Sequence, residues 1–552
     1  MLHRELLING VFLGGPCDTS VGKEVSRSPW TGHVVGTWAE AGPAEIEAAL
    51  DAAATAFPLW SLSSAEERRE LLLRIASLIR DRREELANLM VQEIGKPITA
   101  ALAEIDRTQI TFELFAGLTD CGYAPVDISH DPRSSNYSLE VQREARGPVL
   151  AITPYNWPFN LAAHKIGPAL ACGCTVVLKG SEKAGLCTLE LARLIHEAGC
   201  PAGVVNAIQC PTPLAARMVS DPRIKVVSFT GSAAVGWHIR SQVPDKHVVL
   251  ELGGTAPCIV TPSADLRVAA QRIALSGNVY AGQVCISAQN VYAHSSVIGE
   301  FSSLLAEELA LLPCGDPSLP ETVVGPVIDP AAAERIREAI GVALPPGQEG
   351  VPRLAGGRAV DTESQATTSL PLVSLGDSPL KKGGELSPSP REGEVAPRSG
   401  DGGGNTGVPP SPTASGLPPL GGEHLPQLQE QAAEGAAHPN LIRPTLLIGG
   451  GPTDEIFGPV LTLRPYESLP DVIQEINGSP WGIHAAIFTQ EESEVTQAKQ
   501  IECSALVVND GPSVRFDAMP YGGVKRSGLG REGGIFALDD YSLPKSTIKR
   551  SN

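Results

Sequence analysis

The sequence predicts an α/β fold with a doubly wound, largely parallel sheet. Between residues 147 and 254, short apolar runs such as GPVLAITP, CTVVLKG and KVVSFTG alternate with helical stretches such as AGLCTLELARLIHEAG. This alternation is typical of βαβ units. The chain has 552 residues, of which 42% are hydrophobic, which is enough for two or three globular domains. Ligands bind at the carboxyl ends of the strands in such sheets, so the residues that follow these runs are the first candidates for a site.

Helices are predicted before this sheet, from residue 44 to residue 115. The stretches EIEAALDAAATAFPLW and AEERRELLLRIASLIRDRREELANLMVQEI place apolar residues at positions i, i+3, i+4 and i+7, which is the spacing of one helical face. We expect these helices to serve as cover and scaffold. A second α/β region begins near residue 255 and contains the helical stretch SADLRVAAQRIALSG.

The composition changes abruptly between residues 345 and 437. The segment SPSPREGEVAPRSGDGGGNTGVPPSPTASGLPPLGG is dense in proline, glycine and serine and has few apolar side chains to bury. Such a composition predicts a disordered or loosely attached insertion. A tolerated surface insertion is the simpler interpretation, and a dedicated docking segment is the alternative. Ordered sequence resumes at LIRPTLLIGG.

Charge and cysteine content restrict the class of protein. The formal net charge of -19 argues against a nucleic-acid partner, because a phosphate track needs clustered lysine and arginine. The start, MLHRELLINGVFLGG, lacks the features of a secretory signal, and no stretch has the roughly 18 apolar residues of a membrane span. The odd count of 11 cysteines fits a reducing compartment. We therefore expect a cytoplasmic protein with no nucleic-acid or membrane partner and no metal site.

Three polar residues stand out as candidates for chemistry. Cys285, in GQVCISAQN, is a nucleophile if it ionises and a core cysteine otherwise. Glu251 ends the β-branched run VVLE, where a carboxylate is either solvated or kept for acid–base work. Asn156 lies in a rigid turn between Tyr155 and Trp157, where its amide can stabilise an oxyanion together with the backbone N–H of Cys285. Taken singly, each of the three residues can be explained by packing, solvation or turn formation. Taken together, they suggest a nucleophile, a base and an oxyanion donor.

A second group of residues suggests a nucleotide site. Gly231 and Ser232, in VVSFTGSAAVG, lie where a strand gives way to a helix, and Gly236 follows. A helix N-terminus of this kind can receive a phosphate, although the segment is not the G-x-G-x-x-G fingerprint. Lys179 and Glu182 end another strand, where an ammonium and a carboxylate can hold ribose hydroxyls or simply be solvated.

The combination of motifs resembles the NAD(P)-dependent aldehyde dehydrogenase superfamily. TPYNWPFN, LACGCTVVLKGSEKA, FTGSAAVG, LELGGTAP, GQVCISAQN, DEIFGPV and MPYGGVKRSGLGREG occur in the order found there. The resemblance implies the aldehyde dehydrogenase fold and a homodimer or homotetramer. The implied parts are a Rossmann-like dinucleotide-binding domain (1–123 and 146–253), an α/β catalytic domain (254–344 and 438–537), the insertion (345–437) and a small β oligomerisation element (124–145 and 538–552).

The resemblance also assigns roles. Cys285 matches the nucleophile that forms a thiohemiacetal and then a thioester, Asn156 matches the oxyanion donor, and Glu251 matches the base that activates water. On the cofactor side, Lys179 and Glu182 match residues that hold the adenosine ribose, and Ser232 matches a pyrophosphate contact. Glu455 and Phe457, in DEIFGPV, match residues at the nicotinamide. Glu182 would repel a 2′-phosphate, which favours NAD over NADP. Gly180 stands where a proline is usual, and this change is expected to loosen the turn after Lys179.

The substrate is expected to be a small oxygenated or anionic aldehyde. GQVCISAQ and MPYGGVKRSG are most similar to the lactaldehyde and phosphonoacetaldehyde dehydrogenase subgroup. Arg107 and Arg515 are candidates to pair with an anionic tail, with surface or interface arginines as the alternative, and Tyr155 and Trp157 are candidates to line the site. Val284, before the nucleophile, is apolar, which weighs against a phosphorylated substrate.

Two other functions remain open from the sequence. A catalytically weak homologue that acts as a binding or scaffold protein is the first, because the insertion lies in the catalytic domain. A thiol hydrolase that uses Cys285 and Glu251 without a nucleotide is the second, but it leaves the cofactor motifs unexplained. NAD-dependent thermal stabilisation separates the second from an oxidoreductase.

Overall fold

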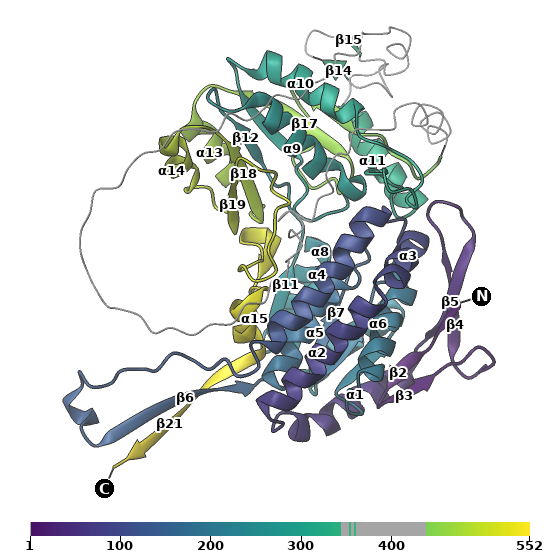
Figure 1. The fold of residues 1–552 in the computed structure, drawn as a ribbon, viewed down its shortest axis with the longest axis vertical. Coiled ribbons are helices and arrows are strands. Elements are labelled where there is room, and N and C mark those ends of the chain that lie inside the picture. The colour runs from purple at the N-terminus through teal and green to yellow at the C-terminus, as the bar shows by residue number, and fades with distance from the viewer. Residues whose placement is uncertain (1, 344–352, 355–357, 360–437, 552) are drawn as a thin grey trace, which may run out of the picture.

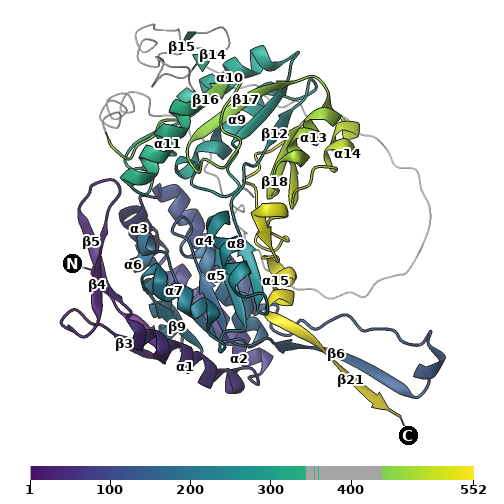
Figure 2. The same cartoon turned by 180° about the vertical axis from the view of Figure 1, so that it is seen from behind.

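Two α/β units make up most of the molecule, and they lie one above the other in Figures 1 and 2. The computed structural model describes residues 2–343, 353–354, 358–359 and 438–551. The predicted insertion, 345–437, falls almost entirely outside the described residues. The lower unit in Figure 1 contains an eight-stranded sheet, and the upper unit contains a six-stranded sheet.

The eight-stranded sheet confirms the predicted βαβ units. Its strands, in spatial order, are β20 (Gly528–Leu529), β11 (His247–Glu251), β10 (Val226–Thr230), β7 (Val149–Ile152), β8 (Val176–Lys179), β9 (Val205–Ile208), β2 (Leu6–Ile8) and β3 (Val11–Leu13). The five central strands are parallel. At the two ends β20 pairs antiparallel with β11 and β2 pairs antiparallel with β9, and β3 pairs antiparallel with β2. The strand order reverses direction around β7, which is where doubly wound sheets bind ligands.

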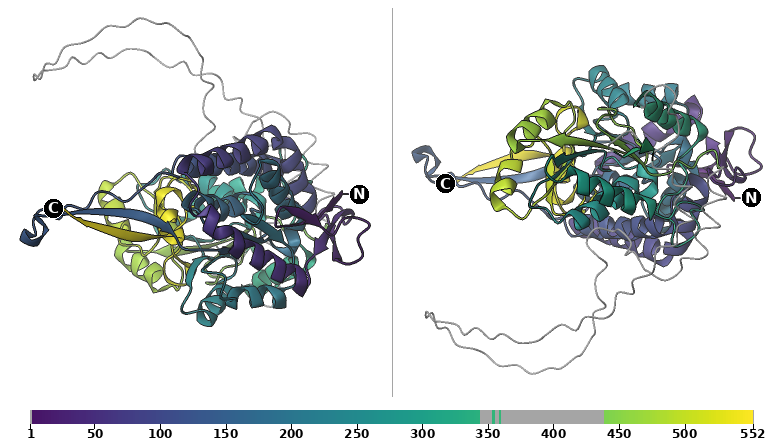
Figure 3. Two further views of the ribbon diagram at one scale, coloured as in Figure 1. Left: turned by 90° about the horizontal axis from the view of Figure 1, so that it is seen from below. Right: turned by 90° about the horizontal axis from the view of Figure 1, so that it is seen from above.

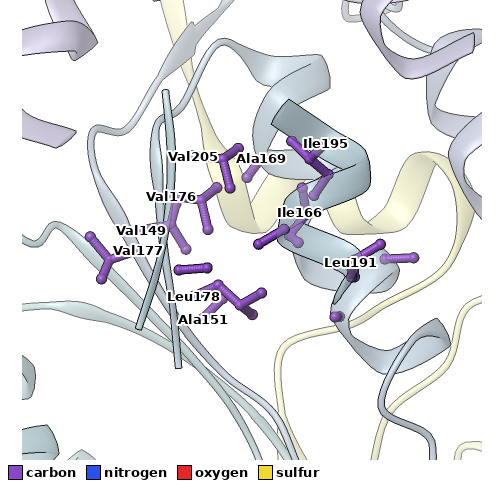
Figure 4. Packing of buried hydrophobic residues seen from close by; sticks show 14 of the residues in the cluster. Val149, Ala151, Ile166, Ala169, Val176, Val177, Leu178, Leu191, Ile195 and Val205 are labelled. Carbon is purple, nitrogen blue, oxygen red and sulfur yellow. The ribbon is translucent and has the colours of Figure 1, made fainter. Parts of the chain in front are cut away.

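Helices enclose this sheet. They are α1 (Pro43–Trp60), α2 (Ala65–Asp81), α3 (Arg83–Ile94), α4 (Ile98–Ala116), α5 (Asn160–Cys172), α6 (Gly185–Glu197), α7 (Thr212–Ser220) and α8 (Ala233–Gln242). The helices predicted from 44 to 115 are therefore present. Apolar side chains of α5 and α6, including Ile166 and Ile195, face valines of β7, β8 and β9 in the core (Figure 4). This packing fixes the strand ends relative to α5.

The second unit is built on a parallel sheet with its own apolar core. Its strands, in spatial order, are β16 (Thr445–Ile448), β17 (Val460–Tyr466), β13 (Asn290–His294), β12 (Cys258–Val260), β18 (His484–Phe488) and β19 (Ala505–Val508). The accompanying helices are α9 (Leu266–Asn278), α10 (Ile298–Ala310), α11 (Pro330–Ala343), α13 (Leu469–Gly478) and α14 (Glu492–Ala498). The chain returns to the first unit through α15 (Gly534–Tyr541).

Three smaller strand groups complete the described structure. They are the sheet β1 (Leu2–Arg4), β5 (Val34–Glu40) and β4 (Gly22–Arg27), the pair β14 (Arg353–Leu354) and β15 (Arg358–Ala359), and the ribbon β6 (Tyr137–Ala145) and β21 (Ser542–Arg550). The ribbon projects from the body of the protein (Figure 3). No helix in the described ranges is long and apolar enough to cross a bilayer.

Candidate active site

The central strands deliver the predicted polar residues to one edge of the eight-stranded sheet. Lys179 is the last residue of β8 and Glu251 the last of β11, while Asn156 follows β7 by a short turn. Because parallel strands end at the same edge, these side chains share that edge although the chain separates them widely.

Cys285 reaches this edge from the second unit through a strained turn. The 3-10 segment Val279–Gly282 contains left-handed residues at Tyr280 (φ 53°), Ala281 (φ 53°) and Gly282 (φ 66°). A side chain at position 282 would place its Cβ 2.3 Å from the backbone oxygen of Gly458, so only glycine fits there. Tyr280 is fully buried and donates from its hydroxyl to Ile94 O at 3.0 Å. Consecutive left-handed residues cost free energy, and this anchoring holds them in place.

The Cys285 thiol is partly exposed and has a tyrosine partner. Its Sγ lies 2.8 Å from the hydroxyl of Tyr521. Poor hydration of the site raises the pKa of Cys285 to about 11, whereas the Tyr521 hydrogen bond and the charge of Arg515 act to lower it. The carboxylates of Glu455 and Glu251 also act to raise this pKa. The thiol therefore carries its proton at neutral pH in the free protein.

Asn156 is buried and its side chain faces the nucleophile turn. Its Nδ2 donates to Gln283 O at 2.8 Å, and the neighbouring Tyr155 hydroxyl donates to Gln283 Oε1 at 3.0 Å. Gln283 stands two residues before Cys285, so these bonds connect the predicted oxyanion donor directly to the nucleophile loop. Tyr155 and Trp157 flank Asn156, as the sequence requires, and both are half-buried.

A buried ion pair that the sequence did not reveal holds the Asn156 turn. Lys96 Nζ donates to Glu104 Oε2 at 2.5 Å and to the backbone oxygen of Asn156 at 3.0 Å. Glu104 Oε1 accepts from the backbone N–H groups of Phe159 at 2.9 Å and Asn160 at 3.1 Å. Both charged side chains are 0% exposed. The pair therefore contacts the backbone of the turn at Asn156 and again at Phe159 and Asn160. The Lys96 ammonium also lies 3.4 Å from the centre of the Trp157 ring.

Replacing Lys96 with methionine is expected to lower the free energy of unfolding by about 3–5 kcal/mol. The change removes one partner of a buried pair and leaves the Glu104 carboxylate without a compensating charge. Chemical unfolding measures the loss. Lys23→Met is the matched control, because Lys23 is exposed and donates to two backbone oxygens, at 2.8 and 2.7 Å, so its loss should stay below about 1 kcal/mol. Equal losses in the two variants would contradict the importance of the buried pair.

Glu251 is buried beside a second ion pair. It is 2% exposed, and neither carboxylate oxygen has a hydrogen-bond partner among the described residues. Burial raises the pKa of Glu251 well above its usual range, and the charge of Glu532 adds to this effect. Lys165 acts in the opposite direction and itself donates to Ser228 Oγ and Glu532 Oε1, both at 3.0 Å. A carboxyl group of raised pKa facing a site is suited to acid–base chemistry.

The two candidate arginines have different surroundings. Arg107 forms a bidentate pair with Asp517, at 2.6 and 3.2 Å, and Asp517 also contacts His164 Nε2 at 3.0 Å. Arg515 lies over the Tyr521 ring, 3.5 Å from its centre, with 5% of its side chain exposed. Its Nη2 lies 3.6 Å from Glu532 Oε2, an ion-pair distance, but neither Nε nor Nη2 makes a hydrogen bond among the described residues. Arg515 therefore has hydrogen-bond donors to offer to a ligand.

The strand ends also carry polar groups that fit a dinucleotide. Lys179 Nζ lies 3.9 Å from Glu182 Oε1, and Ser232 is the exposed N-cap of α8, next to Gly231. Thr153, Thr230 and Gln209, which follow or end β7, β10 and β9, are buried and have side-chain atoms without a partner among the described residues. Unsatisfied buried polar atoms indicate a missing ligand or water. The sequence assigned none of the three a role, although Thr153 and Thr230 lie within the motifs TPYNWPFN and FTGSAAVG.

Glu455 and Phe457 lie near the nucleophile from the second unit. Glu455 Oε1 accepts from the backbone N–H of Gly254 at 3.2 Å, and limited hydration raises its pKa to about 7. The Phe457 ring meets the Tyr155 ring edge-on, 6.4 Å between centres. A Cβ at position 253 would overlap the Glu455 carboxylate, so Gly253 permits this approach.

Two glycines of the predicted cofactor segments pack closely against their neighbours. Gly180 packs closely, since an added Cβ would lie 2.1 Å from Thr188 Oγ1, and the expected loosening of the turn stays a prediction. Gly236 lies one turn into α8, where its N–H donates to Ser232 O and an added Cβ would lie 2.5 Å from Leu252. Gly236 therefore packs the helix closely, and its role as a cofactor contact stays a prediction.

Comparisons with known proteins agree with this geometry. A family profile described as "Aldehyde dehydrogenase family" matches residues 18–373 and 423–547. The chain is 29% identical over 534 residues to 3-sulfolactaldehyde dehydrogenase of Priestia aryabhattai, covering 96% of each chain. It is 29% identical over 551 residues to succinate-semialdehyde dehydrogenase [NADP(+)] GabD of Escherichia coli, covering 98% of this chain and 96% of that one.

Solved structures of other proteins share this fold over the whole length of the chain. NADP-dependent glyceraldehyde-3-phosphate dehydrogenase from Bacillus halodurans superposes with a TM-score of 0.79 at 26% identity, covering 100% of both chains. NAD-dependent aldehyde dehydrogenase from Sinorhizobium meliloti superposes with a TM-score of 0.78 at 28% identity, covering 100% of this chain and 95% of the other. With its α/β fold and NAD(P)-binding architecture, the chain belongs to the aldehyde dehydrogenase family of oxidoreductases, which oxidise aldehydes to acids.

Proposed function

We propose that the protein oxidises a small oxygenated or anionic aldehyde to its carboxylic acid with NAD, through a covalent intermediate on Cys285. The observation that carries this proposal is the placement of Arg515, buried beside the nucleophile: its Nε and Nη2 make no hydrogen bond among the described residues, and its ion pair with Glu532 is long, at 3.6 Å. An arginine in this setting can fix a carboxylate, sulfonate or polar tail while the carbonyl faces Cys285.

The acylation step begins with attack of Cys285 Sγ on the carbonyl carbon. The thiol proton must leave first, and water carries it to the solvent, so that Glu251 stays ionised for the later attack of water. The carbonyl oxygen gains charge as the thiohemiacetal forms, and Asn156 Nδ2–H and the backbone N–H of Cys285 are the donors that stabilise it. Bound NAD supplies the hydride acceptor, and loss of the hydride from carbon leaves a thioester on Cys285.

Deacylation uses water and the same carboxylate. Glu251 takes a proton from the attacking water, the carbon–sulfur bond breaks, and the electron pair returns to Sγ. Lys165 and Glu532 lie close enough to Glu251 to influence its ionisation. A carboxylate in this place favours hydrolysis over transfer of the acyl group to a thiol acceptor.

NAD is preferred over NADP because the ribose end of the site is acidic. Glu182 is exposed at the end of the Lys179 turn, and its charge, with that of Glu24, raises the pKa of Glu40 in addition to the effect of burial. Three carboxyl groups close to one another disfavour the added negative charge of a 2′-phosphate. Relatives include both NAD- and NADP-dependent enzymes, so this preference is particular to these side chains.

The charges near the nucleophile favour an anionic tail. Arg107, Lys165 and Arg515 are cationic, and Asp517 and Glu532 pair with them. Glu251 and Glu455 also lie near the nucleophile, but burial raises the pKa of each carboxyl group and so reduces its negative charge. Arg107 makes two hydrogen bonds to Asp517, at 2.6 and 3.2 Å, whereas the Arg515–Glu532 pair is longer, at 3.6 Å, which leaves Arg515 as the stronger candidate for the substrate. The names of relatives that act on 3-sulfolactaldehyde, succinate semialdehyde and lactaldehyde support this class, and similarity to the lactaldehyde and phosphonoacetaldehyde dehydrogenase subgroup remains part of the proposal.

Assembly and location form part of the same proposal. The ribbon β6–β21 exposes apolar side chains, including Leu543 and Ile548, and β19 is an edge strand of its sheet. Both features suit a homodimer or homotetramer, with the oligomerisation element at 124–145 and 538–552 and the domain limits given above. All 11 cysteines are free, which supports a reducing compartment such as the cytoplasm.

NADH formation across an aldehyde panel tests the function. The panel contains lactaldehyde, succinate semialdehyde, phosphonoacetaldehyde and simple aliphatic aldehydes, each with NAD and with NADP. We expect kcat/KM to be highest for a small oxygenated or anionic aldehyde and at least about tenfold higher with NAD. Preference for long aliphatic aldehydes would contradict the substrate class, and equal rates with NADP would contradict the cofactor choice. A folded protein inactive on every aldehyde would favour a binding or scaffold role.

A further inference from the structure

Tyr521 contacts the nucleophile, yet the mechanism described above assigns it no role. Its hydroxyl lies 2.8 Å from Cys285 Sγ, and its side chain is 1% exposed. Ile286 and Ile483 pack with it in a small apolar cluster that Val284 and Cys285 border. The hydroxyl therefore has no access to bulk water, and the sulfur is its hydrogen-bond partner.

The surrounding structure holds the ring firmly. Tyr521 N donates to Glu532 O at 2.9 Å, and Glu532 N donates to Tyr521 O at 2.7 Å. The Arg515 guanidinium covers one face of the ring at 3.5 Å, and the His484 ring meets it edge-on at 5.4 Å. These contacts restrict the orientation of the Tyr521 ring and keep its hydroxyl directed at Cys285 Sγ, as a preorganised hydrogen-bond donor requires.

The same segment also borders the proposed base. Gly522 follows with φ +152°, and a Cβ there would lie 2.9 Å from Glu251 Oε1. The chain at Tyr521–Gly522 thus passes beside both Cys285 and Glu251. Glycine at 522 lets the carboxylate approach the backbone, while the preceding tyrosine reaches the sulfur.

We propose that Tyr521 is a catalytic residue of this site, whose hydroxyl donates a hydrogen bond to Cys285 Sγ and stabilises the thiolate. The inference rests on the proposed function and deepens it. A thiolate has no proton to give, so the phenol is the donor in that state. The bond acts twice, when the thiol loses its proton before attack and when the thiolate leaves the thioester. Tyr521 keeps its own proton throughout, and the proton of the attacking water goes to Glu251.

The charges that face the sulfur explain why an added donor matters. Arg515 favours the thiolate, whereas Glu251 and Glu455 disfavour it, and the poor hydration of the site disfavours it most. Burial also raises the pKa of Tyr521 well above its usual range, so the phenol stays protonated wherever Cys285 ionises. His484 has its pKa lowered to about 4 by burial, which leaves it uncharged at neutral pH.

Alkylation of Cys285 in Tyr521→Phe tests the inference without any aldehyde. Iodoacetamide reacts with the thiolate, and mass spectrometry of the peptide that contains residue 285 follows this cysteine among the 11 in the chain. Tyr466→Phe is the matched control, since it removes a buried tyrosine hydroxyl that donates to Val260 O at 3.5 Å. We expect Tyr521→Phe to slow alkylation about ten- to a hundredfold at fixed pH and to move its pH midpoint upward, because hydrogen bonds to charged groups have this strength.

Steady-state kinetics complete the test. Tyr521→Phe should lower kcat/KM for the aldehyde by a similar factor and leave the KM for NAD unchanged, whereas Tyr466→Phe should change neither. An unchanged alkylation midpoint in Tyr521→Phe would overturn the inference, even if the wild-type protein oxidises aldehydes. Wild-type protein that forms no NADH with any aldehyde would instead overturn the proposed function, and the alkylation result would still decide whether Tyr521 stabilises the thiolate.

Discussion

Cys285→Ser is expected to reduce NADH formation by a factor on the order of 10⁶, the size of effect seen when the nucleophile of a covalent mechanism is removed. A serine hydroxyl ionises far less readily than a thiol, so its attack on the carbonyl carbon should be much slower. Steady-state and single-turnover assays on the preferred aldehyde measure the loss. No burst of NADH is expected, because no thiohemiacetal forms.

The control for this variant is Cys314→Ser. Cys314 belongs to the same α/β unit and donates to Leu312 O at 3.2 Å, so its replacement tests the general effect of the substitution. Cys314→Ser should retain wild-type rates, and both variants should keep thermal stabilisation by NAD, since neither residue is expected to hold the cofactor. Residual turnover in Cys285→Ser near that of the wild type would show that another group forms the covalent bond.

The residues of the site that lie at strand ends could be predicted from the sequence. Asn156, Lys179 and Glu251 each follow or end a β-branched run, and parallel strands bring such positions to one edge. The helices from 44 to 115 were equally predictable, because their apolar spacing is regular. Cys285 was a candidate nucleophile from its own segment, and the family resemblance assigned its role. Periodicity could not place it near the strand ends, because it enters on a loop whose left-handed turn depends on contacts with Gly458 and Ile94.

The supporting residues could not be predicted for a physical reason. Lys96 and Glu104 lie in a stretch predicted to be helical, and nothing in its pattern indicates a contact with Asn156. Asn156 is 60 positions from Lys96 along the chain. Arg107 and Asp517 are separated by 410 positions, so their pairing exists only in the folded state. The N-terminal strands β1, β2 and β3 were also absent from the expectations, because they have three residues each, too few to show alternation.

Glu251→Gln is expected to separate the two half-reactions. Acylation should still produce about one NADH per active site as a burst, provided that water can carry away the thiol proton. Steady-state turnover should fall by about 10²- to 10⁴-fold, the usual contribution of a general base. Glu308→Gln is the matched control, because Glu308 is also buried, at 8% exposure, but pairs with Arg267 on the surface of the second unit.

The pH dependence makes this prediction specific to Glu251. A base must be ionised to accept a proton, and burial and Glu532 raise the pKa of Glu251 well above its usual range. Deacylation in the wild type should therefore rise with pH through the neutral and alkaline range, instead of reaching its maximum near pH 5. The glutamine variant should lose this rise, since its amide does not titrate, while Glu308→Gln should keep it. A variant that loses the burst as strongly as the steady state would place Glu251 at the attack of Cys285 rather than at the attack of water.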